Sequence, residues 1–155
     1  MSSEIIQAMS ASDIGKIHDL CDLPVIVKGI QHPDDAQAAI EGGAASVWVS
    51  NHGGRQLNDG PASVSVLPEI VARVAGRVPV IFDSGVRSAE DVFKALALGA
   101  DMVALGRPIL YALVVGGVPA VTDLMKGFQH NLKNVMQLAG TKTAADIRST
   151  PLRHS

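Results

Sequence analysis

Lysine, histidine, arginine and aspartate residues stand beside glycines at four places in this 155-residue sequence. These places are Lys28-Gly29, segment 50–56 (SNHGGRQ), segment 83–87 (DSGVR) and Gly106-Arg107-Pro108. Arginine and lysine side chains bind carboxylates and phosphates, and glycine lets a ligand approach the backbone closely. Histidine exchanges a proton near neutral pH. The four places therefore predict a site that binds an anion and holds a base.

Each of these residues also has a purely structural interpretation. Lys28 could extend from a strand end to water along its aliphatic stem, and a lone His52 is more often a hydrogen-bonded structural residue than a base. Asp83-Ser84-Gly85 could be a simple turn, and Arg107-Pro108 could begin the next helix. A glycine turn that leads into a helix beside Arg87 is, however, also how phosphates are held. The joint occurrence of all four places favours the ligand interpretation.

The elements that must position these groups are predicted from the apolar pattern. Four runs are rich in β-branched residues, at 25–27, 47–49, 80–82 and 102–105, and each ends just before one of the polar places. Continuous apolar runs are typical of strands buried on both faces, as in a parallel sheet covered by helices. The carboxyl ends of such strands share one rim, so the charged side chains should meet there.

Helices are predicted between and after these strands. Residues 34–41 follow Pro33, which is favoured at a helix start, and residues 89–98 follow Ser88, with Asp91 placed for a capping box. Glycines close both helices, at Gly42-Gly43 and at Gly99. Further helices are predicted at 13–20, capped by Ser12, and at 64–75, 120–138 and 144–148. The helix at 120–138 presents one apolar face, formed by Leu124, Phe128, Leu132, Val135 and Met136.

An internal repeat relates the two halves of this pattern. The residues Gly29-Ile30, Asp35, Gly43-Ala44 and Val47 recur 56 positions further along as Gly85-Val86, Asp91, Gly99-Ala100 and Val103. Each copy has the order of a βαβ unit, and two units build four parallel strands. A closed (β/α)₈ barrel needs eight. We therefore predict an α/β fold, a parallel (β/α) half-barrel with C-terminal helices. It forms a single domain over residues 1–155, with an irregular segment at 1–11.

Composition limits the function classes. Hydrophobic residues make up 47% of the chain and the net charge is −2, which excludes a disordered protein and leaves no basic stripe for nucleic acid. Cys21 is the only cysteine, and the histidines lack ligand spacing, so no disulfide and no metal site are predicted. The longest apolar run, 111–121, is about half of the roughly 20 residues that a membrane span needs. Acidic residues interrupt the first twenty positions, so we expect a soluble cytoplasmic protein without a signal peptide.

At these motifs the sequence resembles the C-terminal half of the FMN-dependent α-hydroxy-acid oxidising enzymes, the family of lactate oxidase, glycolate oxidase and mandelate dehydrogenase. The matching stretches are LPVIVKGIQHPDDA, WVSNHGGRQLNDGP, VPVIFDSGVRSAEDVFKALALGADMVALGRP and FQHNLKNVMQLAGTKTAADI. They cover nearly the whole chain, from Ile14 to Arg148. SNHGGRQ is the most specific motif. Ser84 stands where many members carry glycine, which is closest to the lactate oxidase branch.

The resemblance implies a (β/α)₈ barrel with FMN at its carboxyl-end rim. Lys28 would lie against the pyrimidine edge of the flavin, and Ser50 would also contact it. His52 would take a proton from a small L-2-hydroxy acid, of the lactate or glycolate type, and Arg55 would bind the acid's carboxylate as the 2-keto acid forms. The remaining rim residues would hold the ribityl chain and the phosphate: Asp83, Ser84, Gly85, Val86, Arg87, Gly106 and Arg107.

The family's first four β/α units have no counterpart in the sequence. An open four-stranded sheet would expose two strand edges and the apolar interior of the barrel. We therefore expect a homo-oligomer or a complementary N-terminal half-barrel to cover this surface, with no nucleic acid and no membrane as partner. A non-catalytic half-barrel that keeps at most an FMN- or phosphate-binding rim is the alternative.

Overall fold

The computed structural model describes residues 9–153, in which four parallel strands form one sheet in the order β1-β2-β3-β4. The strands are β1 (Ile26–Ile30), β2 (Ser46–Val49), β3 (Val80–Phe82) and β4 (Met102–Val103). In the central strand β2, Val47 pairs with Val27 on one side and with Val80 on the other. Phe82 pairs with Val103 at the far edge. The predicted four-stranded parallel layer is therefore confirmed.

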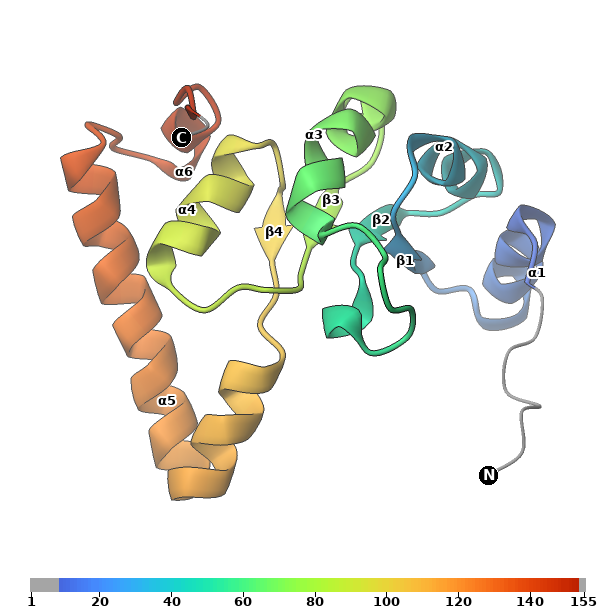
Figure 1. Cartoon of the computed structure of the whole chain (residues 1–155). Helices are drawn as coiled ribbons and strands as arrows, with labels where there is room; N and C mark the ends of the chain where they lie inside the picture. Colours follow the sequence, from blue (N-terminus) through green and yellow to red (C-terminus); the bar gives the residue numbers. More distant parts are fainter. Residues whose placement is uncertain (1–8, 154–155) are drawn as a thin grey trace.

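Helices connect the strands in the predicted alternation. Helix α1 (Ala11–Cys21) precedes the sheet, and α2 (Pro33–Glu41), α3 (Ser63–Val74) and α4 (Ala89–Ala97) join successive strands (Figure 1). The capping box of α4 is present, since Ser88 Oγ accepts from the Asp91 backbone and the Asp91 carboxylate accepts from the Ser88 backbone.

The start of α1 differs from the prediction. The residue before its first turn is Ser10, not Ser12, because the Asp13 carboxylate accepts the Ser10 backbone N–H at 2.8 Å. Of the segment predicted to be irregular, residues 1–8 lie outside the described residues, and Ala11 already belongs to the helix.

One face of the sheet carries the core. Val47 and Val49 of β2 are fully buried, as is Leu67 of α3, and both α2 and α3 contact this strand. Each such aliphatic side chain contributes about 1.5–3 kcal/mol by leaving water. On the opposite face Ile26 is 47% exposed and Met102 is 54% exposed. The prediction of strands buried on both faces is therefore wrong for β1 and β4, because four strands do not close a barrel that would cover their inner side.

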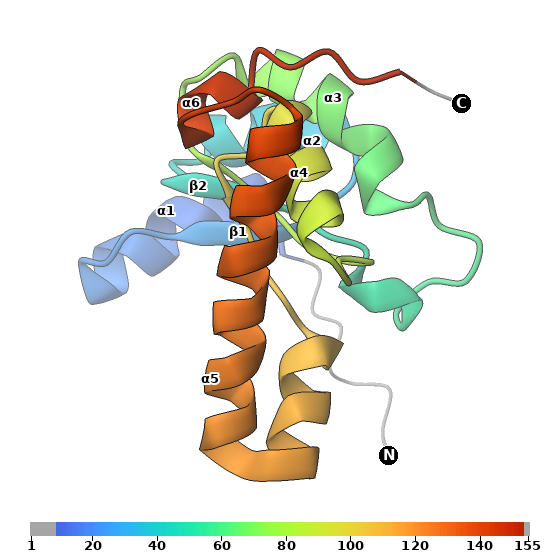
Figure 2. The ribbon, with the colours of Figure 1, turned by 90° about the vertical axis from the view of Figure 1, so that its left-hand side faces the viewer.

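After β4 the chain forms a helical hairpin. Helix α5 (Arg107–Leu138) is broken at Gly117, whose φ of 62° and ψ of −152° are accessible essentially only to glycine. Its first arm runs away from the sheet, and its second arm runs back past the first to pack against α4 (Figures 1 and 2). We predicted only the second arm, from residue 120, and the first arm was missed. The face predicted for the second arm is half-buried against the domain, as expected. Helix α6 (Ala144–Ile147) follows and buries Ile147.

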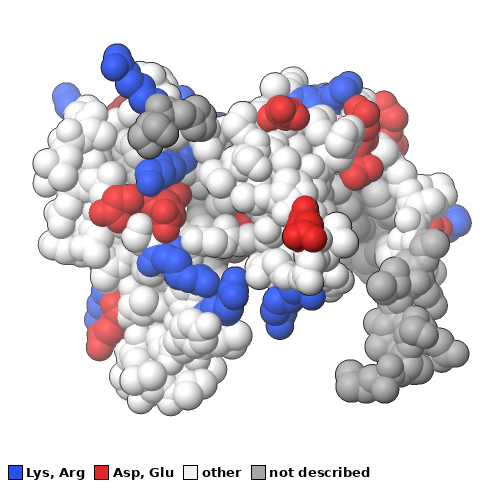
Figure 3. All heavy atoms as spheres, in the orientation of Figure 1, with Lys and Arg blue, Asp and Glu red and all other residues white. Residues whose placement is uncertain are grey.

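By length and composition alone, α5 is apolar enough to cross a membrane. Its uncharged residues 108–122 fall on both sides of the break, however, and the second arm carries Asp123, Lys126 and Lys133. The hairpin therefore presents an apolar tip rather than a straight apolar span. The tip is free of acidic and basic side chains (Figure 3), and Val114 and Val115 there are 86% and 85% exposed.

Candidate active site

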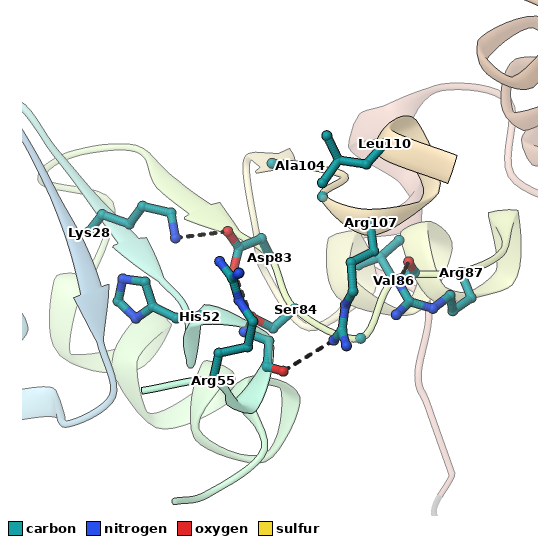
Figure 4. Close-up of a pocket in the computed structure, with 13 residues that line it drawn as sticks. Lys28, His52, Arg55, Asp83, Ser84, Val86, Arg87, Ala104, Arg107 and Leu110 are labelled. Atoms are coloured by element: carbon teal, nitrogen blue, oxygen red, sulfur yellow. Dashed lines mark hydrogen bonds and ion pairs between the residues drawn. The ribbon is translucent and has the colours of Figure 1, made fainter. Parts of the chain in front are cut away.

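The carboxyl ends of the strands surround a cavity of about 260 Å³ (Figure 4). Lys28 comes from β1, and the other predicted residues follow β2, β3 and β4. The structure brings the following predicted residues together in the cavity wall: Lys28, His52, Arg55, Asp83, Ser84, Gly85, Val86, Arg87, Gly106 and Arg107. Ser50, the remaining predicted residue, is buried behind this wall.

Lys28 lies inside β1 and not after it, as we had predicted. The strand continues through Gly29 to Ile30 with a shift of register between Lys28 and Ile30. The ammonium Nζ donates to Ser50 Oγ at 2.9 Å and lies 3.1 Å from Asp83 Oδ2. It also stands 5.1 Å from the centroid of the Trp48 ring, within the range of a cation–π interaction. Lys28 is therefore held at the rim from three sides.

Asp83 is the acidic partner of this lysine. Burial raises the pKa of its carboxyl group, but hydrogen bonds with Ser50, Ser84 and Lys28 and the charge of Lys28 outweigh burial, so the net pKa lies below its usual range. Asp83 is consequently a carboxylate at neutral pH. Its structural task is to hold the Lys28 ammonium, and it is not suited to donate a proton.

We expect this carboxylate to make stability depend on acid pH. The pKa of Asp83 is lower in the folded than in the unfolded chain, so its contribution is complete above the unfolded value and is lost as pH falls through the folded value, below about pH 4. Urea unfolding at pH 6 and at pH 3 checks this. The fall in unfolding free energy should be smaller in Asp83→Asn than in the parent chain, and equal falls would contradict the assignment.

His52 lies in a short 3₁₀ helix, η1 (His52–Gly54), directly after β2. Two local hydrogen bonds shape this loop: Asn51 Oδ1 accepts from the Gly53 backbone at 3.0 Å, and Ser50 Oγ accepts from the His52 backbone at 3.1 Å. The imidazole packs over Gly29, where an added Cβ would stand 2.8 Å from His52 Cε1. The absent side chain of Gly29 thus makes room for the ring.

Replacing Gly29 by alanine should displace the His52 imidazole from its place beside the cavity. The new methyl group would overlap the ring, and the φ of +98° at this position disfavours any side chain. We expect a changed His52 ring signal in a ¹H–¹³C NMR spectrum. Gly43→Ala is the matched control, because Gly43 has a φ of +96° but no atom within 4 Å of an added Cβ. The same His52 shift in both variants would contradict the steric explanation.

Three arginines reach the cavity from different elements. Arg107, in the first turn of α5, donates from Nη2 to the Gly53 carbonyl at 3.1 Å. Arg55 extends from the loop after β2 toward Asp83 (Figure 4). Arg87 donates from Nη1 to the neighbouring Val86 carbonyl at 3.2 Å. Within residues 9–153, none of the three forms an ion pair, so their charges are available to an anion.

Four residues near the site were not predicted. Gly53, Ala104 and Leu110 line the cavity, and Trp48 lies under the Lys28 ammonium. Leu110 stands one turn after Arg107 in α5. The sequence feature that could have predicted Leu110 was Pro108. Proline is favoured at the first turn of a helix, and we had considered a helix start at this position. Trp48 gave no signal beyond being an apolar strand residue.

Comparison with known proteins identifies the family. Residues 1–154 match the model of the FMN-dependent dehydrogenase family. The chain belongs to this family. An L-lactate oxidase of Lentilactobacillus hilgardii is 53% identical over 146 residues, and a glycolate oxidase of Oryza sativa is 42% identical over 147 residues. These matches cover 94% and 95% of this chain but only 40% of each relative. The chain therefore spans about two fifths of the length of the family members it matches.

Solved structures give the same result for the fold. A lactate oxidase of Pediococcus acidilactici superimposes with a TM-score of 0.93 at 54% identity, covering 96% of this chain and 42% of that protein. A mandelate oxidase crystallised with (S)-4-hydroxymandelic acid gives a TM-score of 0.87 at 39% identity, covering 90% of this chain and 39% of its own. The predicted half-barrel fold, matching the C-terminal part of these proteins, is thereby confirmed.

Proposed function

We propose that this chain supplies the carboxyl-end half of a site for the FMN-dependent oxidation of a small L-2-hydroxy acid, of the lactate or glycolate type, to the 2-keto acid. The observation that carries the proposal is the convergence on one cavity of His52 and three arginines that form no ion pair within residues 9–153. The relatives named as L-lactate and glycolate oxidases support the substrate class. Bound FMN would accept the electron pair of the substrate's carbon–hydrogen bond.

The residues of the rim fit an anionic flavin cofactor. Gly85 and Gly106 line the cavity, and no atom lies within 4 Å of the place where a Cβ would stand on either, so a phosphate could approach their backbone. Arg87 and Arg107 flank these glycines and could neutralise the phosphate. Lys28 would stand at the pyrimidine edge, where a fixed ammonium stabilises negative charge. Asp83, Ser84 and Val86 would line the ribityl chain. We had expected Ser50 to contact the flavin, but it is buried and its hydroxyl accepts from Lys28 Nζ, so Ser50 would act through Lys28.

For the substrate, we assign a proton acceptor and a carboxylate clamp. His52 would take the proton of the 2-hydroxyl group, since a neutral imidazole is a competent base near neutral pH. Arg55 would bind the carboxylate, a bidentate task that suits a guanidinium better than an ammonium. Both side chains line the same cavity wall, so one small acid could contact both.

Activity should require a partner that completes the barrel. The cavity of about 260 Å³ falls short of the roughly 300–1,000 Å³ of ligand pockets that enclose a small molecule. The second face of the sheet is also open, with Ile26 and Met102 about half exposed. Both observations favour a complementary surface that encloses the ligand and covers the apolar strands.

The number of helices favours a complementary N-terminal half over a second copy of this chain. A closed barrel holds one helix for each of its eight strands. This chain already brings α1 to α5, with α1 before β1 and α5 after β4. If two copies closed one barrel, α5 of one copy and α1 of the other would compete for each junction. A partner with four strands and three connecting helices avoids this competition.

Complementation tests the proposal. The chain would be purified alone and together with the N-terminal segment of the L. hilgardii relative that precedes the matched region, and FMN would be added to both. We expect the complex to hold flavin and L-lactate or glycolate to bleach its visible absorption without oxygen. Flavin that binds but is never reduced would overturn catalysis and leave only a binding rim. Absence of flavin binding in both samples would overturn the site altogether.

A further inference from the structure

Ser84 connects two strand ends through a single hydroxyl group. Its Oγ donates to Asp83 Oδ1 at 2.8 Å and accepts from the Gly53 backbone N–H at 3.2 Å. Asp83 in turn lies 3.1 Å from the Lys28 ammonium. A continuous chain of polar contacts therefore runs from Lys28 on β1, through the end of β3, to the loop that carries His52.

The backbone at Ser84 favours a different residue. Its φ is +82°, in the left-handed region where glycine is unstrained and a side chain is not. Glycine would relieve this strain and lose both hydrogen bonds. The serine therefore strains the backbone at position 84, while its hydroxyl holds the neighbouring His52 loop.

The His52 loop needs such support. His52, Gly53 and Gly54 have φ angles of +56°, +69° and +74°, three successive left-handed residues. Within the described part of the chain, η1 is hydrogen-bonded to the other strand ends at Gly53 alone, where Ser84 Oγ binds the N–H and Arg107 Nη2 binds the carbonyl. Arg107 has a long, exposed side chain, whereas Ser84 is short and partly buried. Ser84 is therefore the stiffer of the two attachments.

We propose that Ser84 is a positioning residue that holds the His52 loop in place and links it to the Asp83–Lys28 pair. Loss of the hydroxyl would leave the Gly53 N–H with only its local acceptor, Asn51 Oδ1, and would detach it from the end of β3, so that the His52 imidazole could move away from Gly29. The role of His52 as a base rests on the proposed function, but the mechanical link does not. The link can be tested without flavin or substrate.

The test compares Ser84→Gly and Ser84→Ala in the full 155-residue chain by amide hydrogen exchange, His52 ring NMR signals and thermal unfolding. In Ser84→Gly the Gly53 amide should exchange severalfold faster, because it loses one of its two acceptors and keeps only Asn51 Oδ1. The His52 ring signals should broaden or shift. The melting temperature should stay equal or rise, because the φ strain is relieved. In Ser84→Ala the Gly53 amide should exchange as fast as in Ser84→Gly. The melting temperature should fall, because both hydrogen bonds are lost and no φ strain is relieved.

Ser65→Ala is the matched control, since it removes a serine hydroxyl that bonds the Ala62 carbonyl at 2.7 Å in α3, remote from η1. It should leave Gly53 exchange unchanged. A second readout is the pKa of Asp83, which should rise in Ser84→Gly because one hydrogen bond to its carboxylate is lost. Unchanged exchange at Gly53 would overturn the proposal. Faster exchange at all amides together with a lower melting temperature in Ser84→Gly would also overturn it, because that is general destabilisation.

Discussion

In the complemented protein, His52→Ala should lower the rate of flavin reduction by L-lactate or glycolate about 100- to 10,000-fold, the usual contribution of a positioned general base. Binding of FMN should stay nearly intact. The reason is that His52 faces the cavity from a loop, while the proposed cofactor contacts come from Lys28 and from the ends of β3 and β4. Anaerobic stopped-flow absorption measures the reduction rate, and an FMN titration measures the affinity.

His130→Ala is the control for this experiment, because His130 is an exposed residue of the second arm of α5. It should change neither quantity. Equal losses of FMN binding and of reduction in His52→Ala would contradict the assigned role, since they would indicate that the loop supports the cofactor and not the substrate. An unchanged reduction rate would remove His52 from the chemistry.

The sequence predicted the sheet well because its local and global signals agree. β-Branched runs, capping residues such as Ser88, and glycines after the helices each favour the same alternation of strands and helices. The topology then placed the charged residues at one rim, since the carboxyl ends of parallel strands lie together. The cavity wall accordingly contains every predicted site residue except Ser50.

The ends of helices and strands were predicted less well at glycines, because a glycine can either end an element or lie within it. Lys28-Gly29 was predicted to follow the first strand, but β1 continues through Gly29, whose φ is +98°. Around Gly116-Gly117, valines and glycines have low helix propensity, so a helix start at Pro108 was the only helical signal that we drew from the first arm of α5. The helix is interrupted only at Gly116 and Gly117, because Gly117 takes a backbone conformation that is essentially closed to other residues.

The contacts of individual polar atoms were beyond sequence reasoning. Gly53 is hydrogen-bonded to Ser84, 31 residues further along the chain, and to Arg107, 54 residues further along. Both bonds depend on the backbone angles of the loops that carry these residues. The open inner face was predicted from the count of four strands, and the exposure of Ile26 and Met102 agrees with it. The apolar runs alone did not show it, because a half-barrel and a whole barrel have the same pattern in each strand.

We expect Arg87→Ala to weaken FMN binding about 10- to 100-fold, because a charge-assisted hydrogen bond is worth roughly 1.5–3 kcal/mol. Arg87 follows the β3 turn, and its guanidinium contacts the adjacent Val86 carbonyl, which leaves other donors free for a phosphate. Arg87→Lys should recover part of the affinity, since it keeps the charge without the fork geometry. Arg73→Ala, which removes an arginine paired with Asp34 on the helical side, should leave the affinity unchanged. An FMN titration of the complemented protein checks these values. Unchanged FMN affinity in Arg87→Ala would contradict this contact and would indicate that the phosphate lies near Arg107 rather than at the end of β3.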